Sequence, residues 1–272
     1  MSIKLFSQLI DMIVVTNDDG IYSKGIRTLY RAAAKVFGDG NVVVVAPSGP
    51  QSASGMSLTF HKPLRIDRVE TSSIKGFAVS GTPADCVFLS VFYLLKNRKI
   101  DLVLSGLNEG SNVSMQAIES SGTVSAVKFG LTRNINGIAF SLATEQGIGK
   151  SSFANAGRLI VKILSSIKKN GFPEGVDMLN VNIPGSVSAK TSLRVCGIES
   201  VLFDDYVAKR EDLSKRNYYW LGGRLKRKFA KGTDCFELFT NHSATITPMK
   251  LDYVNSELKK RTLEKIEWAT LA

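Results

Sequence analysis

Short apolar runs alternate with longer amphipathic segments over the first 185 residues, and this alternation restricts the fold more than any other feature. Runs such as 12–16 (MIVVT) and 41–46 (NVVVVA) are typical of strands buried on both faces. Residues 25–37 carry apolar side chains at helical spacing and are followed by glycines. Strands that alternate with helices form a parallel sheet covered on both faces. We therefore expect an α/β protein with a Rossmann-like, doubly wound, mostly parallel sheet.

The same pattern predicts the remaining elements and a soft boundary near residue 185. Further strands are expected at 64–69, 76–79, 101–105, 136–142 and 178–183, and further helices at 82–96, 121–130 and 153–169. Beyond 185 the pattern weakens. We expect residues 1–185 to form a metal- and phosphate-binding core, and residues 186–272 to form an extension with a basic β-ribbon and a terminal helix from 253.

Charge and cysteine usage limit the classes of partner and compartment. The chain of 272 residues has a formal net charge of +11, which favours an anionic partner. Three widely spaced cysteines form no disulfide framework, which fits a reducing compartment. The longest apolar stretch, at 86–95, is too short to cross a bilayer. We expect a cytoplasmic protein without a membrane partner.

Polar residues follow three of the expected strands. Asp18 and Asp19 come after the first strand, Ser52 lies in the loop after the second, and Asn108 and Asn112 follow the strand at 101–105. In open α/β sheets, ligands bind outside the carboxyl ends of the strands. Carboxylate, hydroxyl and amide oxygens suit a hard divalent cation such as Mg²⁺ or Mn²⁺.

The adjacent carboxylates strengthen the case for a cation. If Asp18 and Asp19 converge to about 4 Å, their repulsion is roughly 4 kcal/mol at an effective dielectric constant of about 20. A divalent cation removes that cost, and so does protonation of one carboxyl group. The alternative is a plain Asp-Asp-Gly turn, in which an aspartate caps the next helix.

A helix is expected to begin at Ser121-Gly122-Thr123. Free N–H groups and the positive end of the helix dipole make such a position suitable for an anion. A plain N-cap is the alternative for this segment alone. Beside a cation site, bound phosphate becomes the better interpretation.

Several segments together form a specific pattern. In order, they are VVTNDDGIYSKGI, VVAPSGPQSASGMSLT, VSGTPADCV, DLVLSGLNEGSNV, SSGTVSAVKFG, NVNIP and TITP. From Met12 to about Pro248 the chain thereby resembles the SurE (stationary-phase survival protein) family. Lys24 stands where family members often have proline, and Gln51 replaces a common arginine.

The resemblance implies a metal-dependent 5′(3′)-nucleotidase that hydrolyses nucleoside monophosphates. It implies one divalent metal ion held by Asp18, Asp19, Ser52 and Asn108, and catalysis by Asp18 and Asp19. The implied phosphate contacts are Asn108, Asn112, Ser121, Gly122 and Thr123. A homodimer or homotetramer built through the C-terminal extension is also implied. Two alternatives stay open: a protein that binds RNA or polyphosphate with weak phosphatase activity, and a phosphatase that forms an aspartyl-phosphate.

Residues 209–231 carry nine basic and two acidic residues, which is +7 of the net charge. Aromatic residues at 218–220 lie among them. One interpretation is a surface for nucleic acid or polyphosphate. We favour the other, a solvated β-ribbon with a turn at Gly222-Gly223 and aromatics packed at a subunit contact.

Overall fold

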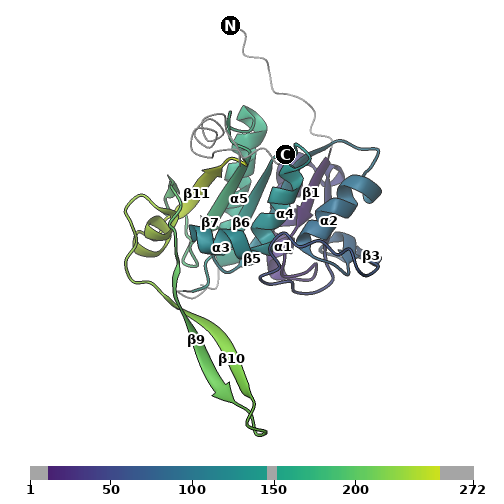
Figure 1. Ribbon diagram of the computed structural model, residues 1–272. Helices are drawn as coiled ribbons and strands as arrows, with labels where there is room; N and C mark the ends of the chain where they lie inside the picture. The colour runs from purple at the N-terminus through teal and green to yellow at the C-terminus, as the bar shows by residue number, and fades with distance from the viewer. Residues whose placement is uncertain (1–11, 146–151, 252–272) are drawn as a thin grey trace, which may run out of the picture.

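The computed structural model describes residues 12–145 and 152–251. Nine strands form one sheet in the order β3-β4-β2-β1-β5-β6-β7-β11-β8 (Figure 1). They are β1 (Met12–Thr16), β2 (Val42–Pro47), β3 (Ile66–Glu70), β4 (Lys75–Val79), β5 (Ile100–Glu109), β6 (Gly137–Leu142), β7 (Met178–Ile183), β8 (Leu193–Val195) and β11 (Ala244–Met249). Only β3 and β11 pair antiparallel to a neighbour, with β4 and β7 respectively. The expected mostly parallel α/β sheet is therefore confirmed.

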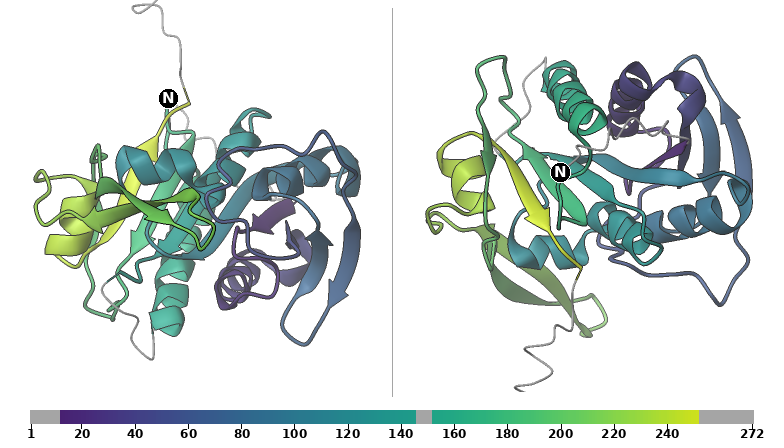
Figure 2. Two further views of the ribbon diagram at one scale, coloured as in Figure 1. Left: turned by 60° about the horizontal axis from the view of Figure 1, so that its bottom comes forward. Right: turned by 90° about the horizontal axis from the view of Figure 1, so that it is seen from above.

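Helices cover both faces of this sheet. They are α1 (Lys24–Phe37), α2 (Pro83–Leu89), α3 (Ser114–Ser120), α4 (Gly122–Leu131) and α5 (Ser152–Asn170). α1 and α5 pack side by side on one face, while α2 packs against α4 on the other (Figure 2). Every residue of β1, β6 and β7 is buried, because both faces of these central strands are covered. Within residues 12–145 and 152–251, no helix is long and apolar enough to cross a membrane.

The strand order reverses between β1 and β5. From β1 the chain proceeds outward through β2 to β4 and β3, and then returns to β5 on the other side of β1. β1 is parallel to both neighbours, β2 and β5. Loops at the carboxyl ends of two such strands turn in opposite directions and leave a crevice between them. The residues that follow β1 and end β5 therefore lie at the position where this fold binds ligands.

Several predicted elements differ in extent from those observed. The predicted helix at 82–96 is α-helical only to Leu89 and continues as a π-helical turn, Ser90–Leu94. β5 extends four residues beyond the predicted end at 105. β8 and β11, both beyond residue 185, belong to the main sheet, so sheet hydrogen bonding does not stop at the expected boundary. The division into two domains stays a prediction, and the expected helix from 253 lies outside the described residues.

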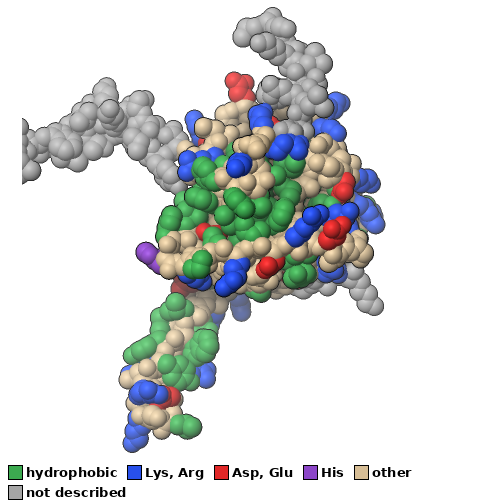
Figure 3. Space-filling model, turned by 90° about the vertical axis from the view of Figure 1, so that its right-hand side faces the viewer, with side chains coloured by type: hydrophobic (Ala, Val, Ile, Leu, Met, Phe, Trp, Pro, Cys, Tyr) green, Lys and Arg blue, Asp and Glu red, His purple; other side chains and the backbone are tan. Residues whose placement is uncertain are grey.

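A long antiparallel hairpin projects from the body of the protein. It consists of β9 (Phe203–Glu211) and β10 (Asn217–Leu225). Figure 3 shows hydrophobic side chains along the part nearest the body, and Lys and Arg towards the far end. The predicted ribbon is confirmed, but its turn is not at Gly222-Gly223. The chain reverses at 212–216, where the Asp212 N–H donates to the Arg216 carbonyl at 3.0 Å.

The two glycines instead lie within β10. Gly222 pairs with Tyr206 across the ribbon, and a Cβ there would come within 2.6 Å of the tyrosine ring. The glycine pair thus makes room for aromatic side chains of the opposite strand. This close packing explains why two adjacent glycines, which otherwise favour a turn, lie within a strand here.

Candidate metal and phosphate site

The loop after β1 is fixed by its own polar side chains. The Asn17 amide nitrogen donates to the Gly20 carbonyl at 3.0 Å and to the Ser23 hydroxyl at 2.9 Å. Ser23 in turn accepts from the Ile26 N–H and caps α1. Asp18 and Asp19 are therefore held between the end of β1 and the start of α1. The Asn17 Oδ1 atom is buried and has no hydrogen-bond partner in the described part of the chain.

Asp18 is a buried carboxyl group tied to helix α4. Only 7% of the residue is exposed, and the Thr123 hydroxyl donates to Asp18 Oδ1 at 2.5 Å. Burial is the main cause that raises the pKa of Asp18 to about 6; the Thr123 hydrogen bond opposes this shift, and the nearby Asp19 charge adds to it. Without a counter-charge, this site disfavours the ionised form.

Asp19 joins the first loop to the end of β5. It is half-buried, and its Oδ2 accepts the Glu109 N–H at 3.2 Å. Burial raises the pKa of Asp19, while the hydrogen bond from Glu109 opposes that shift. The neighbouring Asn108 donates its amide nitrogen to the Gly110 carbonyl at 2.8 Å. This bond engages the amide nitrogen of Asn108 and not its amide oxygen.

The loop after β2 closes over the same place. The Gln51 N–H donates to the Asp18 carbonyl at 2.7 Å, and the Gly55 N–H donates to the Ser120 carbonyl at 3.1 Å. These bonds bring Ser52 beside Asp18, with its own side chain exposed. Ser54 Oγ is buried without a partner among the described residues. Its hydroxyl lies close to Gly122, where an added Cβ would be only 2.5 Å away.

The start of α4 supplies the positive end of a helix. The Ser121 hydroxyl accepts the Val124 N–H at 3.1 Å, so the helix begins where expected and Ser121 is its N-cap, the alternative role considered for this segment. Val124 and Ser125 use Ser121 as their acceptor, whereas the first N–H groups of a helix have no acceptor within it. Gly122 has no side chain between these groups and Asp18, whose Cβ would be 3.1 Å from an added Cβ. Gly122 and Thr123 can therefore present their N–H groups to an anion.

The residues present fit a hard divalent cation. Hydrogen bonds join the loop of the Asp18 and Asp19 carboxylates to the end of β5, which carries the Asn108 amide, and to the loop of the Ser52 hydroxyl. These groups are all oxygen donors, which Mg²⁺ and Mn²⁺ prefer. In the residues that the structure describes, no group of three or more His, Cys, Asp and Glu could hold a metal. Neutral oxygens must therefore complete any such site.

Comparisons with known proteins agree with this architecture. Residues 13–203 match the family model described as Survival protein SurE. The chain belongs to the SurE family. It is 36% identical over 252 residues to the 5′-nucleotidase SurE of Methanocella arvoryzae, covering 90% of this chain and 94% of that one. It is 39% identical over 238 residues to the 5′-nucleotidase SurE of Picrophilus torridus, covering 88% and 90%. The SurE crystal structure from Aquifex aeolicus superimposes with a TM-score of 0.78 at 34% identity, covering 93% of this chain and all of that one.

In this SurE chain, Asn112 is buried and its polar groups are engaged by neighbouring strands. Its amide nitrogen donates to the Ser141 hydroxyl at 2.8 Å, and its backbone N–H donates to Asn182 Oδ1 at 2.8 Å. The Asn180 amide donates to the Asn112 carbonyl at 2.7 Å. Asn112 thus anchors the loop after β5 to β6 and β7. A direct contact between Asn112 and phosphate remains a prediction.

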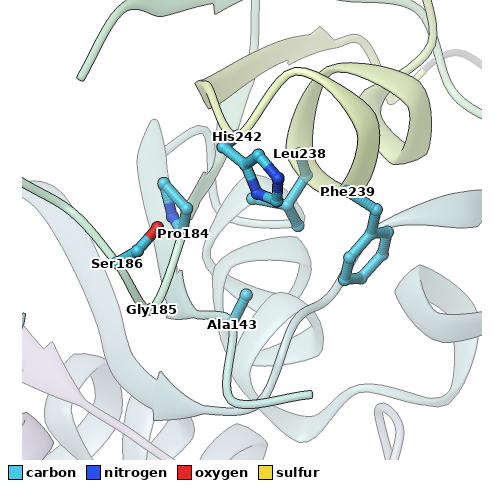
Figure 4. Close-up of a pocket in the computed structure, with 7 residues that line it drawn as sticks. All are labelled: Ala143, Pro184, Gly185, Ser186, Leu238, Phe239 and His242. Atoms are coloured by element: carbon cyan, nitrogen blue, oxygen red, sulfur yellow. The ribbon is translucent and has the colours of Figure 1, made fainter. Parts of the chain in front are cut away.

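A small cavity of about 320 Å³ opens near the ends of β6 and β7 (Figure 4). Its wall includes Ala143 and Pro184 from the two strand ends, and His242 from the segment before β11. It therefore lies on the same sheet edge as the carboxylates, two and three strands away from β1.

Two residues of the polar loops after β1 and β2, Asn17 and Ser54, receive no individual role from the sequence of this SurE member. Asn17 and Ser54 each carry a buried oxygen without a partner among the described residues. Asn17 belongs to the motif TNDDG, so its place beside the carboxylates was visible in the sequence. Ser54 is one of several serines in its loop, and nothing in the sequence separates it from the others.

Proposed function

We propose that this chain hydrolyses nucleoside monophosphates to nucleoside and phosphate with one bound divalent metal ion. The main observation in support is the hydrogen bond between Thr123 and Asp18. It joins a helix N-terminus to paired carboxylates at the point where the strand order of the sheet reverses. A cation bound at the carboxylates and a phosphate bound at the helix start would then lie next to each other. Relatives at 36% and 39% identity that are named 5′-nucleotidase SurE support the substrate class.

The proposed metal ligands are Asp18, Asp19, Ser52 and Asn108. When bound, Mg²⁺ or Mn²⁺ would act as a Lewis acid and lower the pKa of bound water. Asp19 is more exposed than Asp18 and is the better placed of the two to orient or deprotonate water. The more deeply buried Asp18 serves to hold the cation.

The phosphate is proposed to lie against the start of α4. The N–H groups of Gly122 and Thr123 and the hydroxyl of Ser121 would stabilise its oxygens, with Asn108 beside them. Phosphoryl transfer requires little covalent chemistry from the protein. Fixed dipoles and charges therefore provide the stabilisation of the transferring group. Asn112 would act by holding its loop in place.

Phosphate release from a panel of nucleoside monophosphates tests this function. We expect release that is lost in EDTA and restored by Mg²⁺ or Mn²⁺. Asp18→Asn and Asp19→Asn should each abolish it. Asp67→Asn, which alters an exposed carboxylate on β3, is the matched control and should keep full activity. Near-normal turnover in both site variants would contradict the assignment.

A homodimer or homotetramer is proposed to form through the β9–β10 hairpin. Trp220 is 63% exposed and Leu221 is 85% exposed, which is unfavourable for a ribbon in water alone. Three free, buried cysteines support the further proposal that the protein works in the cytoplasm.

A further inference from the structure

A basic groove runs between α1 and α5, on the outer side of the pair. It encloses about 790 Å³. Six cationic side chains line it: Lys24, Arg27, Arg31, Lys35, Arg158 and Lys162. In the part of the chain that the structure describes, its lining contains no carboxylate. A second hollow of about 540 Å³ shares Lys35 and Val161 with it and adds Lys168 and Lys169, so the groove continues along both helices.

The cations form two rows that face each other. The row on α1 occupies positions 24, 27, 31 and 35, which share one side of a helix. At 1.5 Å per residue this row is about 16 Å long. Arg158 and Lys162 are four residues apart on α5 and form the second row. α1 and α5 pack directly against each other (Figure 2), so both rows border one channel.

Among the described residues, no carboxylate pairs with these charges. All six are exposed except Arg27, which is half-buried. In residues 12–145 and 152–251, none of the six forms an ion pair. Like charges spaced three or four residues apart destabilise a helix. Repulsion among the six cationic side chains therefore destabilises the folded state. A polyanion bound in the groove would offset this repulsion.

The floor between the rows is apolar. It includes Ala154, Gly157 and Val161 of α5, all of them at least partly exposed. Gly157 allows the close approach of the helices, because a Cβ there would be 3.2 Å from a methyl group of Thr28. A floor of this kind gives flat, apolar ligand groups a surface to lie on, while arginine guanidinium planes offer stacking.

We propose that this groove binds single-stranded nucleic acid, with phosphates along the two cationic rows and bases over the apolar floor. Inorganic polyphosphate matches the charge but has nothing to place on the floor. A lipid bilayer is flat and cannot reach into a groove. Single-stranded nucleic acid matches both the charge and the apolar surface, and its binding here is independent of hydrolysis at the sheet edge.

Fluorescence anisotropy of the full chain with a labelled 12-nucleotide oligouridylate in EDTA measures this binding directly. For a single strand, the logarithm of affinity falls with the logarithm of salt with a slope of about −0.7 per phosphate neutralised. Six contacts give a slope of about −4, which is a loss of roughly 300-fold between 50 and 200 mM salt. Absence of binding at 50 mM salt would overturn the proposal.

Matched charge reversals locate the binding surface. Arg31→Glu/Lys162→Glu changes the groove, and Lys209→Glu/Arg224→Glu changes the hairpin by the same amount. We expect the groove variant to bind at least 10-fold more weakly and the hairpin variant to stay within 2-fold of the unaltered protein. Equal weakening, or loss only in the hairpin variant, would refute the groove as the site.

Two further measurements separate the groove from nonspecific effects. If the glutamate variant does not fold, Arg31→Gln/Lys162→Gln replaces it and should reduce the salt slope by about 1.4. An unchanged slope would count against the proposal. Long-chain polyphosphate or anionic vesicles should displace the oligonucleotide only at phosphate concentrations at least 10-fold above those of unlabelled oligonucleotide. Equal competition by either would show that the floor plays no part and would overturn the proposal.

Discussion

Replacing Asp18 by asparagine removes a buried charge but keeps an oxygen that can accept the Thr123 hydrogen bond. In the folded protein the pKa of Asp18 is raised from 3.8 to about 6, so folding of the metal-free chain disfavours the ionised carboxylate. Between pH 3.8 and 6 the folded state holds a proton that the unfolded state has lost. The stability of metal-free protein therefore falls as pH rises through this window.

The magnitude follows from the size of the shift. A shift of about 2 pKa units corresponds to about 3 kcal/mol above pH 6. At pH 5 roughly half of this penalty is already present, so about 1.4 kcal/mol more is lost by pH 7.5. Asparagine carries no charge and has no such penalty. The Asp18→Asn variant should thus be more stable than the unaltered protein at pH 7.5 by up to about 3 kcal/mol, and its advantage should shrink at pH 5.

Urea unfolding in EDTA at pH 5 and pH 7.5 provides the assay, followed by far-UV circular dichroism. Asp67→Asn on the exposed part of β3 is the control and should shift the free energy of unfolding by less than about 0.5 kcal/mol at both pH values. Added Mn²⁺ at 100 times its dissociation constant should stabilise the unaltered protein by about 2.7 kcal/mol and leave Asp18→Asn unchanged. An Asp18→Asn variant less stable than the unaltered protein at pH 7.5 would refute the reasoning.

Three further predictions concern single features of the structure. Thr123→Val removes the donor to Asp18 and should lower kcat/KM for nucleotide hydrolysis by about 10- to 100-fold, whereas Thr123→Ser should restore it. Gly106 has a φ of +124°, and an added Cβ would lie 2.1 Å from the Phe140 carbonyl oxygen. Thermal unfolding should therefore show a loss of at least about 3 kcal/mol for Gly106→Ala. The loss should be about 1–2 kcal/mol for Gly110→Ala, where an added Cβ meets only the Asn108 side chain at 3.6 Å. Light scattering should show a smaller assembly for Trp220→Glu/Leu221→Glu than for Lys209→Glu, and an unchanged mass would argue against the hairpin as the subunit contact.

The central fold was predictable because its strands are apolar on both faces. Such runs stand out in the sequence, and a parallel order follows from the helices between them. β11 was not identified as a strand of the main sheet. It pairs with β7, more than 60 residues earlier, and long-range pairing leaves little local signal. α3 was missed because Ser114–Ser120 has no clear apolar stripe, and contacts such as Met115 N–H to the Glu199 carbonyl at 2.7 Å hold it in place.

The candidate site was predictable in part for the same reason. Asp18 and Asp19 directly follow a recognisable strand, so their position at the sheet edge follows from the fold. The burial of Asn112 in a hydrogen-bond network could not be predicted from the sequence. Its role depends on Ser141 and Asn182 from two other strands, and such a network exists only after the sheet has formed.

The directions of the hydrogen bonds at the start of α4 predict different roles for the hydroxyls of Ser121 and Thr123. A hydroxyl has one proton to donate, and Thr123 gives its proton to Asp18. Ser121 accepts from Val124 and keeps its own proton for a ligand. In the proposed enzyme, Ser121 can therefore donate to phosphate, whereas Thr123 reaches phosphate only through its backbone N–H. A loss of the Ser121 hydroxyl should then weaken substrate binding, while a loss of the Thr123 hydroxyl acts through the Asp18 carboxylate on the chemical step.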